Sequence, residues 1–435
     1  MSKFKNYGSL TLFKPRHSRI SHALLMSLAA TTFTLAGCKA ANKAAPELTA
    51  TTGKFTEAAE KFYVKRFHAT QEAFRTGKDT ANYDTEIDFG TELKLRPLER
   101  GASALPDDAL AELVEYAEKN NSASFLLYEN GKVTSEHYFG DYTPSTLLNA
   151  KSLAKPLGVI AVGRAIHTGH IGSLDQSVSD YIVEWKDKPQ AAIKIRHLLD
   201  MRTGLLEQQD PVGPEDVLSR AYLHPHHDEV IIHEYPLINE PGTRYEYANA
   251  NSELVATLIQ RATGMSYQDW LENEVLAPLG ATGGSIWLNR EGGTAHAGCC
   301  VKLTSETYFR LAIMVLNKGL WDGEVFLPES YVSEMARETP QNKHAGMGVY
   351  NGKHYKKYRG ALHPDKPRDV TAALHNEPYI DKDILMFDGN ANQVIFILPS
   401  RNAVIARLGP KPRGEEKWDN TILPNSYVRA LGQNN

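Results

Sequence analysis

The chain has 435 residues and a formal net charge of −4 at pH 7, with 48 Lys and Arg against 52 Asp and Glu. This balance gives no reason to expect a nucleic-acid partner, because phosphates bind clustered basic side chains. The length is enough for one large domain or two, with a sizeable buried core.

The first 37 residues have the organisation of a secretory signal. Basic residues precede an uncharged run of 15 residues from Ala23 to Gly37. A membrane-spanning helix needs about 17 to 25 apolar residues, so this run is typical of a signal-peptide core. It ends in "LAGC", which resembles the lipobox of bacterial lipoproteins, with Cys38 as the lipidated residue. The alternative is an ordinary secretory signal with a chance cysteine.

A lipid at Cys38 would anchor the mature chain in the bacterial cell envelope. Lys39 stands where an inner-membrane retention signal would have aspartate, so we predict the outer membrane, facing the periplasm. Removing residues 1–37 leaves 43 basic against 52 acidic side chains, a net charge of −9. We therefore expect contact with the membrane through the lipid, and no nucleic-acid partner.

Residues 38–103 begin as a small, polar tether and continue as a helix. Apolar residues recur there at helical spacing, which predicts an accessory N-terminal helix and lead-in. These residues are Phe55, Ala59, Phe62, Phe67 and Phe74. The main domain is predicted over residues 104–435.

The main domain opens with a helix and then an antiparallel hairpin. Residues 106–120 have acidic side chains in the first turn and apolar residues at helical spacing. Two apolar stretches follow, joined by Asn130 and Gly131, a tight-turn pair. A second hairpin, Gln393–Leu398 and Ala403–Leu408, lies near the C-terminus. Between the hairpins, the pattern is mostly helical and broken by Gly and Pro loops.

A serine and a lysine three residues apart, in "NAKSLAKPLG", stand at the start of an apolar helix. Pro156 lacks a backbone N–H and is tolerated only near a helix start, which places Ser152 at or just before the first turn. Free N–H groups there favour negative charge developing beside Ser152. Lys155 lies on the same helix face, and burial would give it a neutral amine able to take the serine proton.

The same pair has a simpler interpretation, in which Ser152 caps the helix and Lys155 extends into solvent. A second pattern favours catalysis. Tyr247 and Asn249 lie one residue apart just before another apolar-periodic helix. Beside a Ser–Lys pair, a phenol can relay a proton to the leaving group and an amide can orient substrate and lysine. Tyr245 is nearby but at a less suitable spacing.

With these residues in this order, the chain resembles the serine β-lactamase and penicillin-binding-protein superfamily. It is similar to the class C-like branch, which includes esterases, D-amino-acid peptidases and 6-aminohexanoate-dimer hydrolases. The resemblance covers roughly residues 105–409. It includes "IKIRHLLDMRTGL" after the first motif helix, the segment 303–332 before the last strands, and the terminal hairpin.

The resemblance implies an α+β fold, with an antiparallel sheet flanked by helices, a mainly helical lobe, and a cleft between them. Residue by residue, it implies that Ser152 is the nucleophile and Lys155 its general base. It implies that Tyr247 is a general acid/base and that Asn249 orients the substrate.

A third motif departs from the family pattern, which places Lys-Thr-Gly or His-x-Gly on the strand that edges the cleft. Alignment on that strand gives Asp388, Gly389 and Asn390. Gly389 would allow close approach to substrate, and an N–H near Ala391 could pair with that of Ser152 as an oxyanion hole. The alternative is an ordinary turn before a strand. With Asp388 in place of a cation, we expect neutral or cationic substrates to be preferred over carboxylates.

We therefore expect an envelope-anchored serine hydrolase that cleaves an ester or amide through an acyl-enzyme, without cofactor or metal. The alternatives are a D-alanyl peptidase or β-lactamase acting on cell-wall-like substrates, and a catalytically silent binding protein on the same fold. Cys299 and Cys300 are adjacent, could close only a strained ring and lack the spacing of a zinc site. We expect them to be small buried residues, or else a thiol pair that lines the cleft.

Overall fold

The computed structural model describes residues 51, 53–76, 84–209, 212–360, 362, 373–413 and 418–432. The predicted signal sequence and Cys38 lie outside them. Within these ranges, no helix is long and apolar enough to cross a membrane.

The main sheet consists of antiparallel strands in the order β3-β2-β14-β13-β12-β9. Its central strands are apolar along their whole length because both faces are covered. In β13, Val394 and Phe396 face one core and Ile395 and Ile397 face the other, as the period of two requires. The strands are β2 Ser124–Glu129, β3 Lys132–Tyr138, β9 Tyr350–Asn351, β12 Leu385–Gly389, β13 Gln393–Leu398 and β14 Ala403–Leu408.

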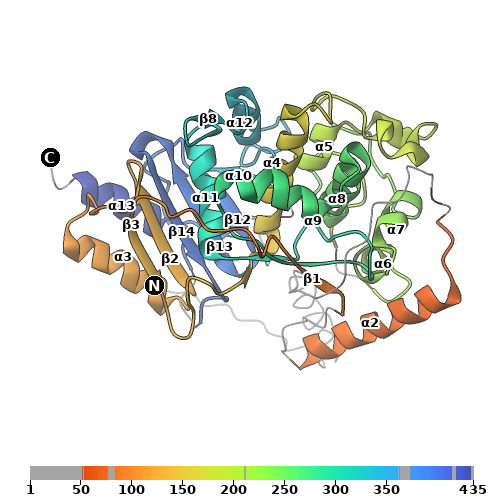
Figure 1. Cartoon of the computed structure of the whole chain (residues 1–435), viewed down its shortest axis with the longest axis horizontal. Coiled ribbons are helices and arrows are strands. Elements are labelled where there is room, and N and C mark those ends of the chain that lie inside the picture. The colour runs from red at the N-terminus through yellow and green to blue at the C-terminus, as the bar shows by residue number, and fades with distance from the viewer. Residues whose placement is uncertain are drawn as a thin grey trace, which may run out of the picture.

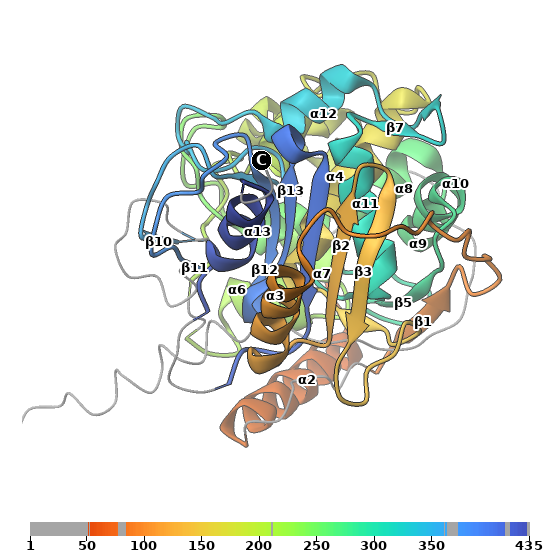
Figure 2. The same ribbon diagram turned by 90° about the vertical axis from the view of Figure 1, so that its left-hand side faces the viewer.

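Helices cover the two faces of this sheet. On one face lie α3 (Asp107–Lys119) and α13 (Ile422–Gly432), which bury Leu113 and Tyr427 against the strands. On the other face lies α11 (Ser305–Leu316), which connects the sheet to the rest of the molecule. Figure 1 shows α3 and α13 on the outer side of the sheet, and Figure 2 shows the same pair in front of it.

A mainly helical lobe fills the other half of the molecule (Figure 1). At its centre α4 packs against α8: α4 is apolar on nearly every side, whereas α8 also buries polar side chains such as Asn251 and Glu253. The helix α8 ends where Gly264 takes the left-handed conformation, φ 74°. The helices are α4 Ala154–His167, α5 Ile195–Leu199, α6 Val217–Leu223, α7 His227–His233, α8 Asn249–Thr263, α9 Tyr267–Trp270, α10 Ala277–Leu279 and α12 Glu329–Ala336.

Shorter strands complete the fold. A second antiparallel sheet has the order β1-β5-β6-β4 and lies between the lobes. Its strands are β1 Glu86–Phe89, β4 Leu148–Asn149, β5 Gly284–Trp287 and β6 Val301–Leu303. Two small hairpins are β7 Leu320–Trp321 with β8 Glu324–Val325, and β10 Tyr358–Arg359 with β11 Ala373–Leu374.

The predicted N-terminal helix is α2 (Glu57–Arg75), which packs against α6. The predicted apolar face is correct at Ala59 and Phe67, both buried. Tyr63, which the pattern missed, is more deeply buried, because its ring meets an aromatic cluster and its hydroxyl donates to a main-chain carbonyl. Phe55 and Phe62 are half-buried, and the side chain of Phe74 lies outside the described residues.

The α+β prediction is confirmed, and both predicted hairpins are present. The terminal hairpin has the bounds expected from its turn, Gln393–Leu398 and Ala403–Leu408. The cysteines require a correction. Cys299 and Cys300 are buried as expected, but they form a disulfide with each other, whereas we had treated them as unbonded side chains. The two sulfurs lie in a buried, largely aromatic cluster, and both contact the hydroxyl of Tyr222.

Candidate active site

Ser152 lies in a single tight turn, Lys151–Leu153, that leads directly into α4. Lys151 has φ 55°, a left-handed conformation that is strained for a residue with a side chain. The side chain of Asn149 accepts the N–H of Lys151 at 2.9 Å and so holds this turn. Strain of this kind collects where a side chain must be presented in one orientation. Here it presents the Ser152 hydroxyl above the amino end of α4.

Lys155 does not extend into solvent, as the simpler interpretation required. Its side chain is buried, and its Nζ donates to Ser152 Oγ at 3.3 Å, Asn249 Oδ1 at 3.1 Å and the Gly298 carbonyl at 2.9 Å. No side-chain capping bond forms at the start of α4. The structure therefore places the amine against the serine oxygen, at the position a general base would need.

Tyr247 and Asn249 reach this pair from the segment that enters α8. Tyr247 Oη lies 3.0 Å from Ser152 Oγ, and the Lys155 amine lies 5.0 Å from the centre of the Tyr247 ring. Asn249 is the first residue of α8 and uses both ends of its amide, accepting from Lys155 and donating to Gln208 Oε1 at 3.1 Å. Both sequence motifs therefore meet at Ser152.

Burial lowers the pKa of Lys155 to about 8, because the ammonium form loses its hydration. The carboxylate of Glu253 opposes this effect and raises the pKa again in part. A lysine with this pKa is partly neutral near pH 7, and only the neutral amine can accept a proton.

We expect kcat/KM for a neutral ester to rise with pH in step with the neutral fraction of Lys155. Between pH 6 and pH 8 that fraction grows about 50-fold for a pKa of about 8, and it levels off above roughly pH 9. The measurement is a pH–rate profile with a substrate that has no ionisable group. A profile that stays flat from pH 6 to pH 8 contradicts the role of Lys155 as base.

The third predicted motif lies beside the same turn. A Cβ on Gly389 would lie 2.5 Å from Leu153 Cδ1 and 2.7 Å from the Ala150 carbonyl oxygen, so only glycine allows β12 to approach this closely. Gln393, at the start of β13, donates to the Asn149 carbonyl at 2.9 Å. The lack of a side chain at Gly389 therefore allows β12 to pack directly against the turn that carries Ser152. The interpretation of the motif as an ordinary turn before a strand leaves this close approach unexplained.

Asp388 requires a correction. The sequence analysis treated it as an uncompensated charge, but its carboxylate forms an ion pair with Arg359, whose side chain is 4% exposed. Asp388 itself is 17% exposed and lines the pocket in front of Ser152. Arg407, on β14, holds the loop after β12 by donating to the Ala391 carbonyl at 3.0 Å. The repulsion expected from Asp388 is therefore offset by a cation behind it.

Asn390 and Ala391 also differ from expectation. The N–H of Ala391, expected in an oxyanion hole, donates to Asn390 Oδ1 at 2.6 Å. Ala391 has φ 70°, which turns its peptide toward Arg407. Of the third motif, Asp388 is the residue that lines the pocket.

The pocket in front of Ser152 has a volume of about 370 Å³. Its walls are largely aromatic and small apolar side chains, a lining suited to a short organic substrate. The lining residues are Ser152, Lys155, Leu199, Met201, Tyr245, Tyr247, Ala345, Gly346, Gly348, Val349, Tyr350 and Asp388.

Two features of this pocket were missed by sequence reasoning. Tyr245 lines it beside Tyr247, and the signal was their spacing of two in an extended segment, which puts both side chains on one side. Arg359 belongs to a short basic stretch, residues 353–359, but no local pattern connects that stretch to Asp388. The pairing of Arg359 with Asp388 is therefore visible only in the tertiary structure.

Comparisons with known proteins concern the family and the fold of this domain. A family model described as Beta-lactamase matches residues 107–420. The 6-aminohexanoate-dimer hydrolase of Paenarthrobacter ureafaciens is 24% identical over 246 residues, which are 54% of this chain and 60% of that protein. Protein flp of Staphylococcus aureus is 26% identical over 174 residues, 37% of this chain and 34% of that protein. The chain thus matches less than two thirds of either relative.

A solved structure from Bacillus anthracis, assigned as a 6-aminohexanoate-dimer hydrolase, has the same fold. Its TM-score is 0.59 at 17% sequence identity, and the match covers 88% of this chain and 98% of that one. At this identity the likeness concerns the fold alone.

Proposed function

The chain belongs to the beta-lactamase family, and on that premise we propose that it is a serine hydrolase that cleaves an ester or amide through an acyl-enzyme. The observation that carries the proposal is the contact of Ser152 Oγ with both Lys155 Nζ at 3.3 Å and Tyr247 Oη at 3.0 Å. A nucleophile touching a base and a second proton-transfer group is the arrangement that acyl transfer needs.

In the first step the neutral Lys155 amine takes the hydroxyl proton as Ser152 Oγ attacks the substrate carbonyl carbon. The tetrahedral intermediate then collapses, the C–O or C–N bond to the leaving group breaks, and that group receives the proton from Lys155 through Tyr247. The acyl group is left as an ester on Ser152. Attack by water, with its proton passing to the same base, releases the acid and restores the serine hydroxyl.

Labelling by two activity probes tests this proposal against its alternatives. A fluorophosphonate should label the purified protein at Ser152, and a fluorescent penicillin should label it weakly or not at all. Labelling by both probes would favour the D-alanyl peptidase or β-lactamase alternative. If neither probe labels the protein, and near-UV circular dichroism shows that the protein is folded, the result would favour a catalytically silent binding protein.

We propose a short linear amide or ester as substrate. The relative from Paenarthrobacter ureafaciens is named for a 6-aminohexanoate dimer, and the pocket in front of Ser152 is lined mainly by aromatic and small apolar side chains, which suit short organic molecules. Asp388 is the acidic side chain of its lining, and the buried Arg359 pairs with it from outside the lining, so the two are close to neutral as a unit. The preference for charged or neutral substrates then depends on whether the substrate contacts Asp388 or Arg359, and Asp388 is the residue that lines the pocket.

Asp388→Asn should shift the substrate preference toward free carboxylates, because it leaves the Arg359 cation uncompensated at the pocket wall. One charge-assisted hydrogen bond is equivalent to about one to two decades in binding. The quantity to measure is the ratio of kcat/KM for two substrates that differ only in a free or methylated carboxylate. Asp381→Asn is a matched control, because Asp381 pairs with Arg401 outside the pocket. An unchanged ratio in Asp388→Asn would show that substrate does not meet this pair.

We further propose that the mature protein is tethered to the cell envelope through Cys38, with residues 38–103 leading into the domain over 104–435. Cys38→Ser should lose the lipid and release or strand the protein, because serine has no thiol to carry the lipid thioether. Metabolic labelling with a palmitate analogue measures this, and Ser152→Ala should keep the label. Equal labelling of Cys38→Ser and wild type would refute the lipid site.

A further inference from the structure

A second cluster of chemically active side chains lies behind the catalytic lysine and takes no direct part in the proposed proton transfers. His227 is the first residue of α7, Glu253 lies in the middle of α8, and His296 lies between β5 and β6. All three are fully or almost fully buried, with exposed fractions of 0%, 2% and 0%. His296 Nδ1 lies 3.3 Å from Glu253 Oε2, and His227 Nε2 lies 3.7 Å from the same oxygen.

None of the ring nitrogens or carboxylate oxygens of these three residues has a hydrogen-bond partner among the described residues. Burial raises the pKa of Glu253, and the nearby main-chain N–H groups of Gly298 and Ala297 counteract this only in part, without reaching hydrogen-bond geometry. A buried polar atom without a partner costs roughly 1 to 3 kcal/mol, and a buried charge costs more. A cluster in which every polar atom lacks a partner needs something to bind.

The rings of the two histidines are held in place by stacking. His296 is sandwiched between Trp287, at 3.6 Å between ring centres, and His227, at 4.1 Å. The planes are nearly parallel, 10° and 16° apart. This packing limits rotation of both imidazoles and keeps a nitrogen of each beside Glu253. The two ring planes are nearly parallel and the lone pair of an imidazole nitrogen lies in its ring plane, so one imidazole must tilt for both to bind a single ion.

We propose that His227, Glu253 and His296 form a binding site for one divalent transition-metal ion of the zinc type. Zinc bonds to nitrogen and carboxylate oxygen are about 2.0 to 2.2 Å long, so ligand atoms of a tetrahedral site lie roughly 3.3 to 3.5 Å apart. The separations of 3.3 and 3.7 Å to Glu253 Oε2 are close to this value. Two imidazoles with one carboxylate suit zinc, cobalt or iron, whereas calcium and magnesium prefer oxygen ligands.

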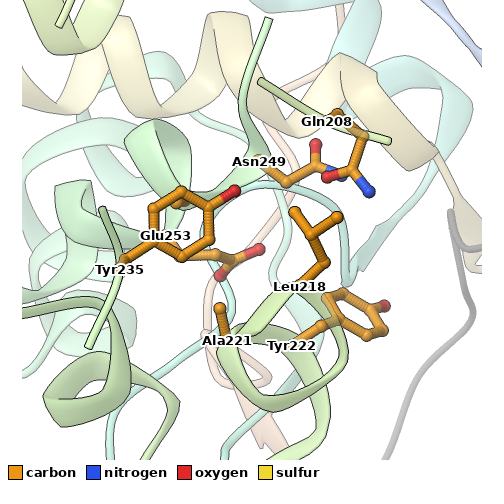
Figure 3. Close-up of a pocket in the computed structure, with 8 residues that line it drawn as sticks. Gln208, Leu218, Ala221, Tyr222, Tyr235, Asn249 and Glu253 are labelled. Atoms are coloured by element: carbon orange, nitrogen blue, oxygen red, sulfur yellow. The ribbon is translucent and has the colours of Figure 1, made fainter. Parts of the chain in front are cut away.

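An adjoining pocket leaves room for a fourth ligand. Figure 3 shows the Glu253 carboxylate directed into it, near Leu218 and Ala221, whereas His227 and His296 do not line it. A water molecule bound there on the Glu253 side would supply the fourth ligand. Asn249 lines the same pocket, so the site borders the catalytic residues without sharing its ligands with them.

No metal is expected from the sequence alone, because sequence patterns for zinc rely on closely spaced ligands, whereas these ligands come from three separate segments. Gly298 is the closest structural link to the catalytic residues. Its carbonyl accepts from Lys155, and a Cβ on it would lie 2.7 Å from Glu253 Oε1.

The test uses the purified chain, stripped with a chelator and dialysed against Zn²⁺ or Co²⁺. We expect about one equivalent of metal by inductively coupled plasma mass spectrometry. We also expect a visible Co²⁺ absorption band typical of a tetrahedral site, and a Tm raised on the order of 5 °C by saturating Zn²⁺. Absence of bound metal together with an unchanged Tm in the wild-type protein overturns the proposal without any variant.

Variants then locate the ion. His296→Gln and Glu253→Gln should each reduce bound metal at least tenfold, while His375→Gln, which changes a buried histidine outside the cluster, should retain it. Near-UV circular dichroism identifies any variant that does not fold, and the wild-type cobalt spectrum is then the deciding measurement. Equal metal content in His296→Gln and wild type would place the ion elsewhere and refute the site.

Discussion

Ser152→Ala is expected to abolish acylation and leave the fold intact. The substitution removes a half-buried hydroxyl whose bonds go to Tyr247 and Lys155, so little packing is lost. Without the oxygen no acyl-enzyme can form, and hydrolysis should fall by at least about 10⁴-fold. Intact-protein mass spectrometry after mixing with a slow substrate should show the acyl adduct in the wild type alone.

Lys155→Ala should lose nearly as much activity, because the serine then has no base. Residues that act as a unit are not additive, so Ser152→Ala combined with Lys155→Ala should be no slower than either single variant. Lys302→Ala is a suitable control, since Lys302 is a partly buried lysine that pairs with Glu86 in the small sheet. Wild-type hydrolysis by Ser152→Ala would show that the nucleophile is another residue.

Gly389→Ala should lower kcat by about 100-fold, the effect expected when a reacting group moves by roughly 1 Å. Gly389 has φ −128°, so alanine is compatible with the backbone there. The added Cβ would lie 2.5 Å from Leu153 Cδ1 and 2.7 Å from the Ala150 carbonyl oxygen. Because the second contact is with main chain, either β12 or the turn that carries Ser152 must move.

The measurement for Gly389→Ala is kcat and KM together with Tm. Overpacking should reduce stability by about 1 to 3 kcal/mol, so the protein should remain folded at the assay temperature. Gly432→Ala, at the end of α13, adds the same atom where no neighbour lies within 4 Å and should change neither quantity. Unchanged kcat and Tm in Gly389→Ala would mean that β12 does not constrain the serine turn.

Local patterns predicted much of the fold because their causes are local. The bounds of β13 and β14 follow from apolar runs interrupted by a turn at Pro399–Asn402, where Asn402 takes the left-handed conformation. The position of Ser152 follows from Pro156, which must stand near a helix start. The two motifs could be proposed as partners only through their order and their resemblance to a family, since 95 positions separate Ser152 from Tyr247.

By itself, the sequence determined the two hairpins of the main sheet, the helices at the N-terminal side of each, and the identity of the Ser152, Lys155 and Tyr247 candidates. Only the tertiary structure determined which partners the charged and polar side chains contact. Arg359 neutralises Asp388, the cysteines bond to each other, and His227, Glu253 and His296 converge from three segments. The physical reason is the separation along the chain over which each kind of interaction acts. Turn and periodicity preferences act over a few residues, whereas ion pairs and ligand sets depend on side chains brought together only when the whole chain has packed.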